Sequence, residues 1–144
     1  MNPFVLWISA ATVAAATCGI ARADDSRAMP LDRPVEVNGY DLACTGVGDE
    51  AREDPRWSEY PVRLEFANRD AQYLSDIDVA VQDANGEVLF TVLCQSPWLL
   101  AKLPPAKYTV TGTFEGVTKS SPFTAPKSGQ SRVVVTFPEV AGDR

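Results

Sequence analysis

The stretch that most constrains the fold of this chain runs from Trp98 to Gly116 and reads WLLAKLPPAKYTVTGTFEG. After the double proline at 104–105, apolar residues and glycine alternate with threonines. The first set is Tyr108, Val110, Gly112 and Phe114, and the second is Thr109, Thr111 and Thr113. This two-residue period is typical of a β-strand with one apolar face. Proline has no N–H to donate to a strand ladder, so we expect the chain to turn a corner of a sandwich there.

The same period recurs on both sides of this stretch, and a tight turn with the sequence DANG at 83–86 separates two of the periodic segments. Further strands are predicted over 34–44 (one or two, around Asn38–Gly39), 60–66, 77–82, 87–94, 117–124 (an edge strand broken by Pro122) and 133–137. About seven short strands at this spacing predict an all-β sandwich.

The apolar strand faces require a second sheet to cover them, because burying each large side chain gains about 1.5–3 kcal/mol. We expect a single core whose inward-facing side chains are Val62, Leu64, Phe66, Ile77, Val79, Val81, Tyr108, Val110 and Phe114. One non-β element is predicted: DEAREDP at 49–55 can form a helical turn, with Asp49 as its N-cap and Pro55 ending it.

The first residues predict an export signal. An apolar run from Phe4 to Ile20 is followed by Ala21-Arg22-Ala23, an A-x-A cleavage pattern. We therefore expect a signal peptide over 1–23 and one sandwich domain over 24–144, with 24–33 as a flexible arm and a periplasmic or secreted location. An uncleaved anchor and a lipoprotein attached through Cys18 remain alternatives.

The charge of the chain excludes some classes of partner. The formal net charge is −6. Binding of nucleic acid or of an anionic lipid surface requires clustered Lys and Arg, and the chain is acidic instead. We expect no nucleic-acid partner and no membrane insertion once the signal is removed.

The cysteine count points to a disulfide. Of the three cysteines, Cys18 falls within the predicted signal, which leaves Cys44 and Cys94 as a pair. An even number of cysteines in an exported domain favours a bond between them, and both are followed by turn-like sequence. Two free thiols with a catalytic or metal-binding role are the alternative, but no CxxC spacing supports it.

The chain contains no histidine, which excludes Ser-His-Asp and Cys-His nucleophile pairs and His-ligated zinc. Carboxylates remain: Asp76 and Asp78 are expected on one face of a strand, with Asp83 near the turn. Acids on a solvent-facing strand are common without catalysis. The segment 83–87 shares residue types with a calcium loop but lacks the EF-hand register, so an Asx turn explains it. We expect no metal and no cofactor.

Two places are candidate binding surfaces. Arg52, Arg56 and Trp57 lie beside an acidic run and could form a recognition surface, although such runs are usually solvated. Trp98 could be an exposed aromatic platform for a sugar or a protein. Packing at the base of the disulfide-closed loop is the favoured interpretation of Trp98.

The segment LPPAKYTVTGTFEG resembles the L-P-x-G-x-Y-x-V-x-x-x-x-x-G signature of carboxypeptidase regulatory-like domains, which are small transthyretin-like β-sandwiches. A group of exported bacterial proteins with this domain is similar over more of the chain, in the segments GVG (46–48), LEFA, YLSDIDVAV, DANGEVL and SPWLLAKLPP. Ala106 stands where the family usually has glycine. The resemblance implies a transthyretin-like Greek-key sandwich and is nearly silent on activity. The transthyretin-like hydrolases use histidines, which this chain lacks.

These observations predict a non-enzymatic, exported binding or structural module of the bacterial cell envelope, with an unknown protein or carbohydrate partner. One alternative is a subunit that adds an edge strand to a larger envelope assembly, which a long uncovered edge strand would favour. Another is a hydrolase that uses carboxylates alone, which a deep cleft lined by two carboxylates would favour.

Overall fold

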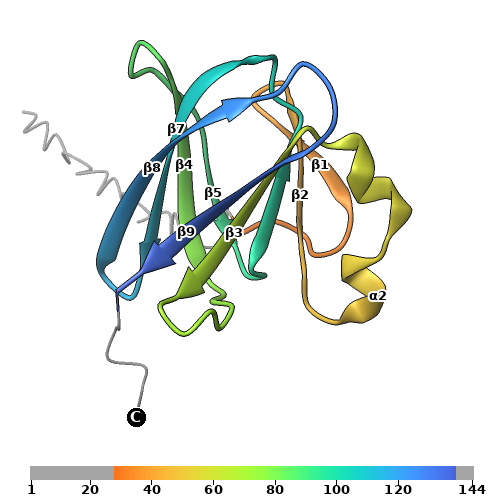
Figure 1. The fold of residues 1–144 in the computed structure, drawn as a ribbon, viewed down its shortest axis with the longest axis vertical. Helices are drawn as coiled ribbons and strands as arrows, with labels where there is room; N and C mark the ends of the chain where they lie inside the picture. The colour runs from red at the N-terminus through yellow and green to blue at the C-terminus, as the bar shows by residue number, and fades with distance from the viewer. Residues whose placement is uncertain (1–27, 139–144) are drawn as a thin grey trace, which may run out of the picture.

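The computed structural model describes residues 28–138, so the predicted export signal lies outside the described residues. Two sheets are stacked face to face (Figure 1). The five-stranded sheet has the order β1 (Pro34–Val37), β2 (Tyr40–Thr45), β6 (Trp98–Ala101), β3 (Val62–Asn68), β9 (Ser131–Phe137). The four-stranded sheet has the order β5 (Val88–Cys94), β4 (Ile77–Asp83), β7 (Ala106–Phe114), β8 (Val117–Ala125). Strand β9 runs parallel to β3, and the other pairs are antiparallel.

The predicted all-β sandwich is confirmed, although residues 28–138 contain nine strands where about seven were expected. The strand that sequence periodicity did not reveal is β6, all four residues of which are buried. Leu99 and Ala101 face the main core, whereas Leu100 faces a second cluster on the other side of the sheet. A strand that is covered on both faces shows no alternation of polar and apolar residues.

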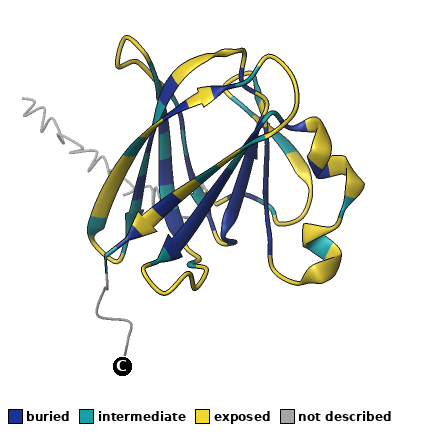
Figure 2. Ribbon diagram, viewed as in Figure 1, coloured by how far each residue is buried: buried dark blue, intermediate teal, exposed yellow. Residues whose placement is uncertain are grey.

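The predicted core is confirmed except at one residue. Buried residues line the inner faces of both sheets (Figure 2), and the predicted core members other than Phe114 are buried. Phe114 is only half-buried, because it is the last residue of β7, next to the exposed turn at Glu115–Gly116. Gly112 lies opposite the densest part of the core, where an added Cβ would lie 3.1 Å from the Phe137 ring and 3.3 Å from the Phe66 ring.

The predicted helical turn forms as α2 (Asp49–Arg52), but its N-cap is Gly48 and no side chain caps it. Asp49 is therefore inside the helix, and its expected capping role was wrong. Pro55 opens a 3-10 helix, η1 (Pro55–Glu59), whose N-cap Asp54 accepts a hydrogen bond from the Arg56 N–H. Proline suits this position because the first N–H groups of a helix have no partner within it.

The segment 46–60, which contains α2 and η1, covers part of the outer face of the five-stranded sheet beside β2. Trp57 and Tyr60 pack there on Leu100 of β6. The Trp57 indole N–H donates to the Ala51 carbonyl oxygen (2.8 Å), and the Gln130 side-chain amide donates to the carbonyl oxygens of Trp57 (2.8 Å) and Tyr60 (2.9 Å). Tyr60, expected at the start of a strand, instead closes η1. No helix in this part of the chain or elsewhere among the described residues could cross a bilayer.

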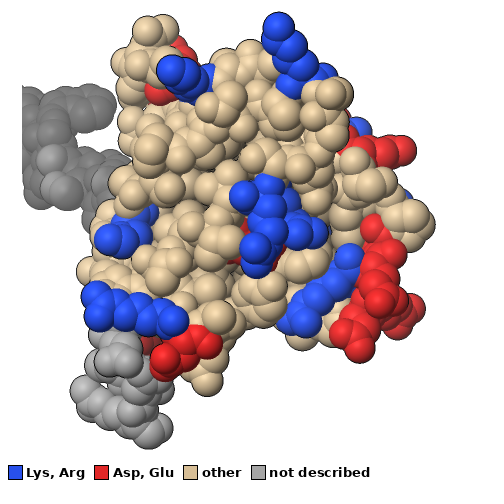
Figure 3. Space-filling view, in the orientation of Figure 1, with Lys and Arg blue, Asp and Glu red and all other residues tan. Residues whose placement is uncertain are grey.

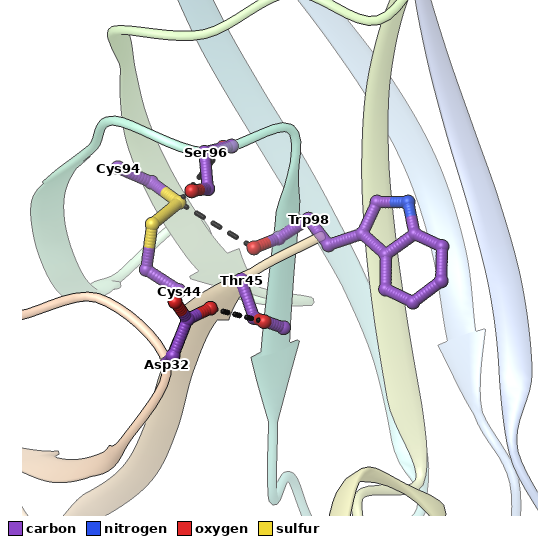
Figure 4. The surroundings of a disulfide bond; sticks show 6 residues. All are labelled: Asp32, Cys44, Thr45, Cys94, Ser96 and Trp98. Atoms are coloured by element: carbon purple, nitrogen blue, oxygen red, sulfur yellow. Dashed lines mark hydrogen bonds between the residues drawn. A yellow bond between two sulfur atoms is a disulfide. The ribbon is translucent and has the colours of Figure 1, made fainter. Parts of the chain in front are cut away.

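The disulfide between Cys44 and Cys94 is present, as predicted (Figure 4). It joins β2 of one sheet to β5 of the other, with 5.7 Å between the two Cα atoms, and both residues are fully buried. The preceding chain crosses the same end of the sandwich: the Met29 N–H donates to the Leu93 carbonyl oxygen (3.0 Å) and the Asp32 N–H to the Cys44 carbonyl oxygen (2.9 Å). The two sheets are thus connected there by a covalent bond and by backbone hydrogen bonds.

Candidate functional site

The four residues predicted as a possible binding surface fall into two groups. Arg56 and Trp57 form one group, in which the guanidinium carbon lies 4.7 Å from the centre of the indole ring and Arg56 is paired with Asp54 (2.7 Å). Arg52 and Trp98 are connected through Tyr73: the Arg52 guanidinium lies 4.9 Å above the Tyr73 ring, which meets Trp98 edge-on. The two arginines are exposed.

Neither tryptophan offers a ring face to solvent. Trp57 is 3% exposed and Trp98 is 6% exposed. Trp98 contacts Gly46, where an added Cβ would lie 2.7 Å from the indole, and the Arg63 guanidinium carbon lies 4.3 Å from the ring centre. Figure 4 shows the indole extending away from the disulfide, over β3. An aromatic platform of the kind proposed for Trp98 would need an exposed ring, so its role here is packing.

The outer face of the five-stranded sheet holds a buried carboxylate, Glu65 of β3, which is 0% exposed. Arg132 of β9 donates to both of its carboxylate oxygens, from Nε to Oε2 and from Nη2 to Oε1 (3.1 Å). The Tyr73 hydroxyl donates to Oε1 (3.0 Å), and Arg63 Nε lies 2.9 Å from Oε2 as an ion pair outside hydrogen-bond geometry. We call Glu65, Arg63, Arg132, Tyr73 and Trp98 the Glu65 cluster.

Strand register brings the Glu65 cluster together. Glu65 is paired with Trp98 on β6 and with Val134 on β9, while Arg63 is paired with Arg132 across the β3–β9 ladder. Two like charges on neighbouring strands repel each other, and a carboxylate between them removes that repulsion. Side chains on the two ladders are about 5 Å apart, which places both guanidinium groups within reach of Glu65.

Tyr73 reaches Glu65 because the turn after β3 folds back on the strand. The Asn68 side-chain oxygen accepts hydrogen bonds from the N–H groups of Asp70 and Gln72 (both 3.0 Å), and its amide donates to the Gln72 side chain (2.8 Å). The returning chain then forms a bridge between Tyr73 and Ala67. Asparagine is suited to such a turn because its short side chain can bond nearby backbone groups.

Glu65 is ionised at neutral pH. Burial raises its pKa, but the hydrogen bonds from Arg132 and Tyr73 and the charges of Arg63 and Arg132 outweigh burial, so the pKa lies below its usual value of 4.5. The hydrogen bond to Glu65 in turn raises the pKa of Arg132. A carboxylate that is held ionised by several partners is a poor general acid, and one whose oxygens are occupied is a poor base.

A groove of about 270 Å³ opens beside the Glu65 cluster, between strands β3 and β9 and the turn that follows β3. Its lining residues are Glu65, Ala67, Asn68, Arg69, Ala71, Tyr73, Arg132, Val134 and Thr136. We call it the Arg132 groove. The Arg132 side chain is 56% exposed, so this arginine faces Glu65 and solvent at once. Figure 3 shows basic side chains gathered over the middle of the β3–β9 face, with acidic atoms visible beneath them.

Of the acidic candidates, Asp83 lies apart from Asp76 and Asp78. Asp83 Oδ1 accepts hydrogen bonds from the N–H groups of Asn85 (2.9 Å) and Glu87 (3.0 Å), which is the predicted Asx turn. At about 3.3 Å per residue, Asp78 and Asp83 lie about 17 Å apart along β4, and glycosidase pairs are closer than about 10 Å. Asp76 is exposed and precedes β4 at a φ of 61°. Within residues 28–138, no three His, Cys, Asp or Glu side chains gather as metal ligands.

In the strand predicted over 60–66, Arg63 and Glu65 alternate with the inward-facing Val62, Leu64 and Phe66, which puts them on the solvent face. Nothing in the sequence gives a reason to add Tyr73, Arg69 or Arg132 to them. The one local signal of an ion pair is the spacing of Arg63 and Glu65, which puts both on the same face of a strand. The residues that bury Glu65 come from the turn after β3 and from β9, and their proximity depends on the parallel β3–β9 pairing.

We expect Glu65→Gln to lower the free energy of unfolding by about 1–3 kcal/mol at pH 7, because it leaves charged donors without their anion. A carboxylate whose pKa is lower in the folded state stabilises above its unfolded pKa, and this contribution is lost as the pH falls through the folded pKa. The difference between wild type and variant should therefore shrink as the pH drops below about 4.5, measured by urea denaturation at several pH values.

The matched control for this experiment is Glu59→Gln. The Glu59 side chain is 73% exposed, and its only ion pair among the described residues is a long one, with 4.0 Å between Oε2 and Lys102 Nζ. It should change stability little at any pH. A Glu65→Gln deficit that stays constant from pH 7 to pH 3 would show that the deficit does not come from the ionised carboxylate.

No protein-family model matches this chain, and no curated protein matches it in sequence. The resemblance to carboxypeptidase regulatory-like domains therefore rests on the motif residues alone. The structure adds one local fact about that motif: the Tyr108 hydroxyl donates to the Pro104 carbonyl oxygen (2.7 Å), across the turn that precedes β7. Ala106, in the position where the family usually has glycine, has no positive φ.

Proposed function

We propose that this protein is a non-enzymatic binding module of the bacterial cell envelope, exported to the periplasm or secreted, that binds its partner on the outer face of the five-stranded sheet. The observation that carries the proposal is the Glu65 cluster beside the solvent-open Arg132 groove. Arginine has N–H donors on three nitrogen atoms, and Glu65 accepts from Nε and Nη2 of Arg132. Nη1 of Arg132 thus remains free to donate to a ligand. The hydrogen bonds to Glu65 already hold the Arg132 side chain in position.

The absence of enzymatic activity is supported by the chemistry of the side chains. The chain has no histidine, and Cys44 and Cys94 are consumed by the disulfide. Glu65 is occupied by its partners, and Asp83 by the backbone of its turn. An activated nucleophile needs a neighbouring base and access to substrate. The Thr45 hydroxyl donates to Asp32 Oδ1 (2.7 Å), but Thr45 is fully buried.

Export is supported by two independent features, the apolar run with its A-x-A pattern and the disulfide between the sheets, since such bonds persist in oxidising compartments. We also propose that the sandwich is a transthyretin-like Greek key. Support comes from the signature segment, which forms the turn before β7 and β7 itself.

Addition of an edge strand to a larger assembly is the second candidate. Strand β8 is nine residues long and, within residues 28–138, pairs only with β7. The strand contains Pro122 and Lys119, and proline and lysine are common devices against edge-to-edge pairing. Strand β9 also lies in contact with β8. The sheet face is for this reason the better candidate surface.

The test is a titration of isotope-labelled exported protein with defined probes: a neutral β-glucan oligosaccharide, a polygalacturonate oligomer and short peptides, followed by amide chemical shifts. At least one probe should give saturable shifts at β3, β9 and residues 68–73. Shifts confined to β8 would favour the assembly subunit instead. Absence of shifts on the β3–β9 face with every probe would refute the binding surface.

In parallel, the protein should show no turnover of ester, peptide or glycoside substrates. An Asp76→Asn, Asp78→Asn double variant is the control. Turnover by the wild type that the double variant loses would establish a carboxylate hydrolase and overturn the proposal. Turnover that the double variant retains would indicate a contaminant.

A further inference from the structure

We infer that the Arg132 groove binds the free C-terminal carboxylate of a peptide whose last two residues have small side chains. This inference rests on the proposed function, because it names the ligand of the same face. Three features of the groove carry it: the charge at its rim, the size and polarity of its lining, and the rigidity of its wall.

The rim of the groove attracts an anion. Arg69 and Arg132 both line it, and Arg63 lies behind it against Glu65. Arg69 forms no hydrogen bond or ion pair with any residue from 28 to 138. The carboxylate inside the groove, Glu65, has both oxygens occupied, so it neutralises one charge while two of the three arginine charges remain uncompensated. Arginine binds carboxylates through two parallel N–H···O bonds, which makes a carboxylate the fitting anion.

An acidic neighbour, Asp70, lies in the same turn, but it does not line the groove. Its backbone N–H is held by the Asn68 side chain. The positive charge of the groove is therefore local, on a protein whose formal net charge is −6. A long polyanion would extend past the groove onto a protein that is acidic overall, whereas a single carboxylate would not.

Size distinguishes a peptide terminus from an acidic side chain. A volume of about 270 Å³ corresponds to about nine water molecules at about 30 Å³ each. A glutamate or aspartate side chain has about half that number of heavy atoms, whereas a terminal dipeptide with two methyl side chains has about the same number. A single acidic side chain would leave much of the groove filled with water.

The lining matches the rest of such a dipeptide. Ala67, Ala71 and Val134 offer small apolar contacts for methyl groups, and the Thr136 hydroxyl can donate to or accept from a peptide group. Tyr73 also lines the groove, and the hydrogen bond from its hydroxyl to Glu65 holds the ring in place. The wall formed by residues 68–72 is fixed by the Asn68 hydrogen bonds, so little conformational entropy is lost when a ligand binds.

The experiment compares three peptides by amide chemical-shift titration of the exported protein. They are acetyl-Gly-Ala-Ala with a free C-terminus, the same peptide with an amidated C-terminus, and acetyl-Ala-Glu-Ala with an amidated C-terminus. We expect saturable shifts at 67–73 and 132–136 with the free acid, and at least tenfold weaker binding of the two amides. Binding of the free acid should weaken as salt is added.

Two variants test the assignment to the arginines. Arg69→Gln should weaken binding of the free acid about tenfold or more without unfolding the protein, since the Arg69 side chain is exposed and forms no hydrogen bond or ion pair with residues 28–138. Arg132→Gln should do the same and in addition disturb Glu65. The matched control is Arg33→Gln, which removes an exposed arginine outside the groove and should leave binding unchanged.

Equal binding of the free acid and its amide, or unchanged binding by Arg69→Gln, would overturn the inference. Tighter binding of the glutamate peptide would also overturn it, in favour of acidic side chains as the ligand. If no peptide binds while an oligosaccharide probe shifts β3 and β9, the inference fails and the proposed binding face stands.

Discussion

Replacing Phe66 by alanine is expected to lower the free energy of unfolding by about 3–5 kcal/mol. Phe66 is fully buried in β3 and faces the four-stranded sheet at Gly112 of β7. Truncation of the ring leaves a cavity between the sheets. Gly112 has no side chain that could move into the cavity, and the Phe137 ring beside it is already fully buried, so the site can collapse only partly. Urea denaturation, with the slope m compared between proteins, measures the loss.

The control is the same substitution at Phe114, which is half-buried at the end of β7 and meets Phe137 edge-on, with 6.0 Å between ring centres. Folding removes less of the apolar area of the Phe114 ring from water, so Phe114→Ala should cost about 1–2 kcal/mol. A larger loss for Phe114→Ala than for Phe66→Ala would contradict the core described for this sandwich.

The different positions of these two rings also show what the sequence can predict about the fold. Alternation along β3, β4 and β7 is a local property, and it identified the inward-facing residues correctly. How far a ring at the end of a strand is covered depends on the turn and on the opposite sheet. For that reason the two-residue alternation predicted that Phe114 is in the core, whereas the structure shows it half-buried.

Strand β6 and the parallel β3–β9 ladder lay beyond sequence reasoning for a related reason. Leu99 and Leu100 are both buried, one against the main core and the other against Trp57 and Tyr60 of the segment 46–60. No period of two can reveal a strand covered on both sides. The pairing of β3 with β9 joins segments far apart in the chain, and nothing local in either strand specifies its partner.

The candidate site depends on those same long-range pairings. The alternation in β3 correctly puts Glu65 on the face opposite the core, and the expectation of solvent there was wrong because Arg132, Tyr73 and Trp98 cover it. The disulfide, in contrast, could be predicted without any geometry. Its evidence was the cysteine count together with the predicted export signal, both read from the sequence alone.

Removing that disulfide is the second change expected to have a large effect. The bond closes a loop with a sequence separation of 50 residues, and the chain-entropy model gives a stabilisation of about 4 kcal/mol for a loop of this length. Domains of this size typically have a total stability of about 5–15 kcal/mol, so the loss is a large fraction of it. The Cys44→Ala, Cys94→Ala double variant should show this loss in urea denaturation.

The effect should be larger than the loop-closure model alone suggests if the bond also holds the two sheets in contact. Cys44 and Cys94 sit on different sheets, and the hydrogen bonds of Met29 and Asp32 at the same end depend on β5 and β2 keeping their relative position. Wild-type protein with its disulfide reduced is the control and should unfold at the same urea concentration as the double variant. A loss below 1 kcal/mol, or two alkylated thiols in non-reducing mass spectrometry of wild-type protein, would show that the bond does not stabilise the fold. If the loss is as large as expected, the fold depends on an oxidising compartment, because the reduced chain would retain little stability.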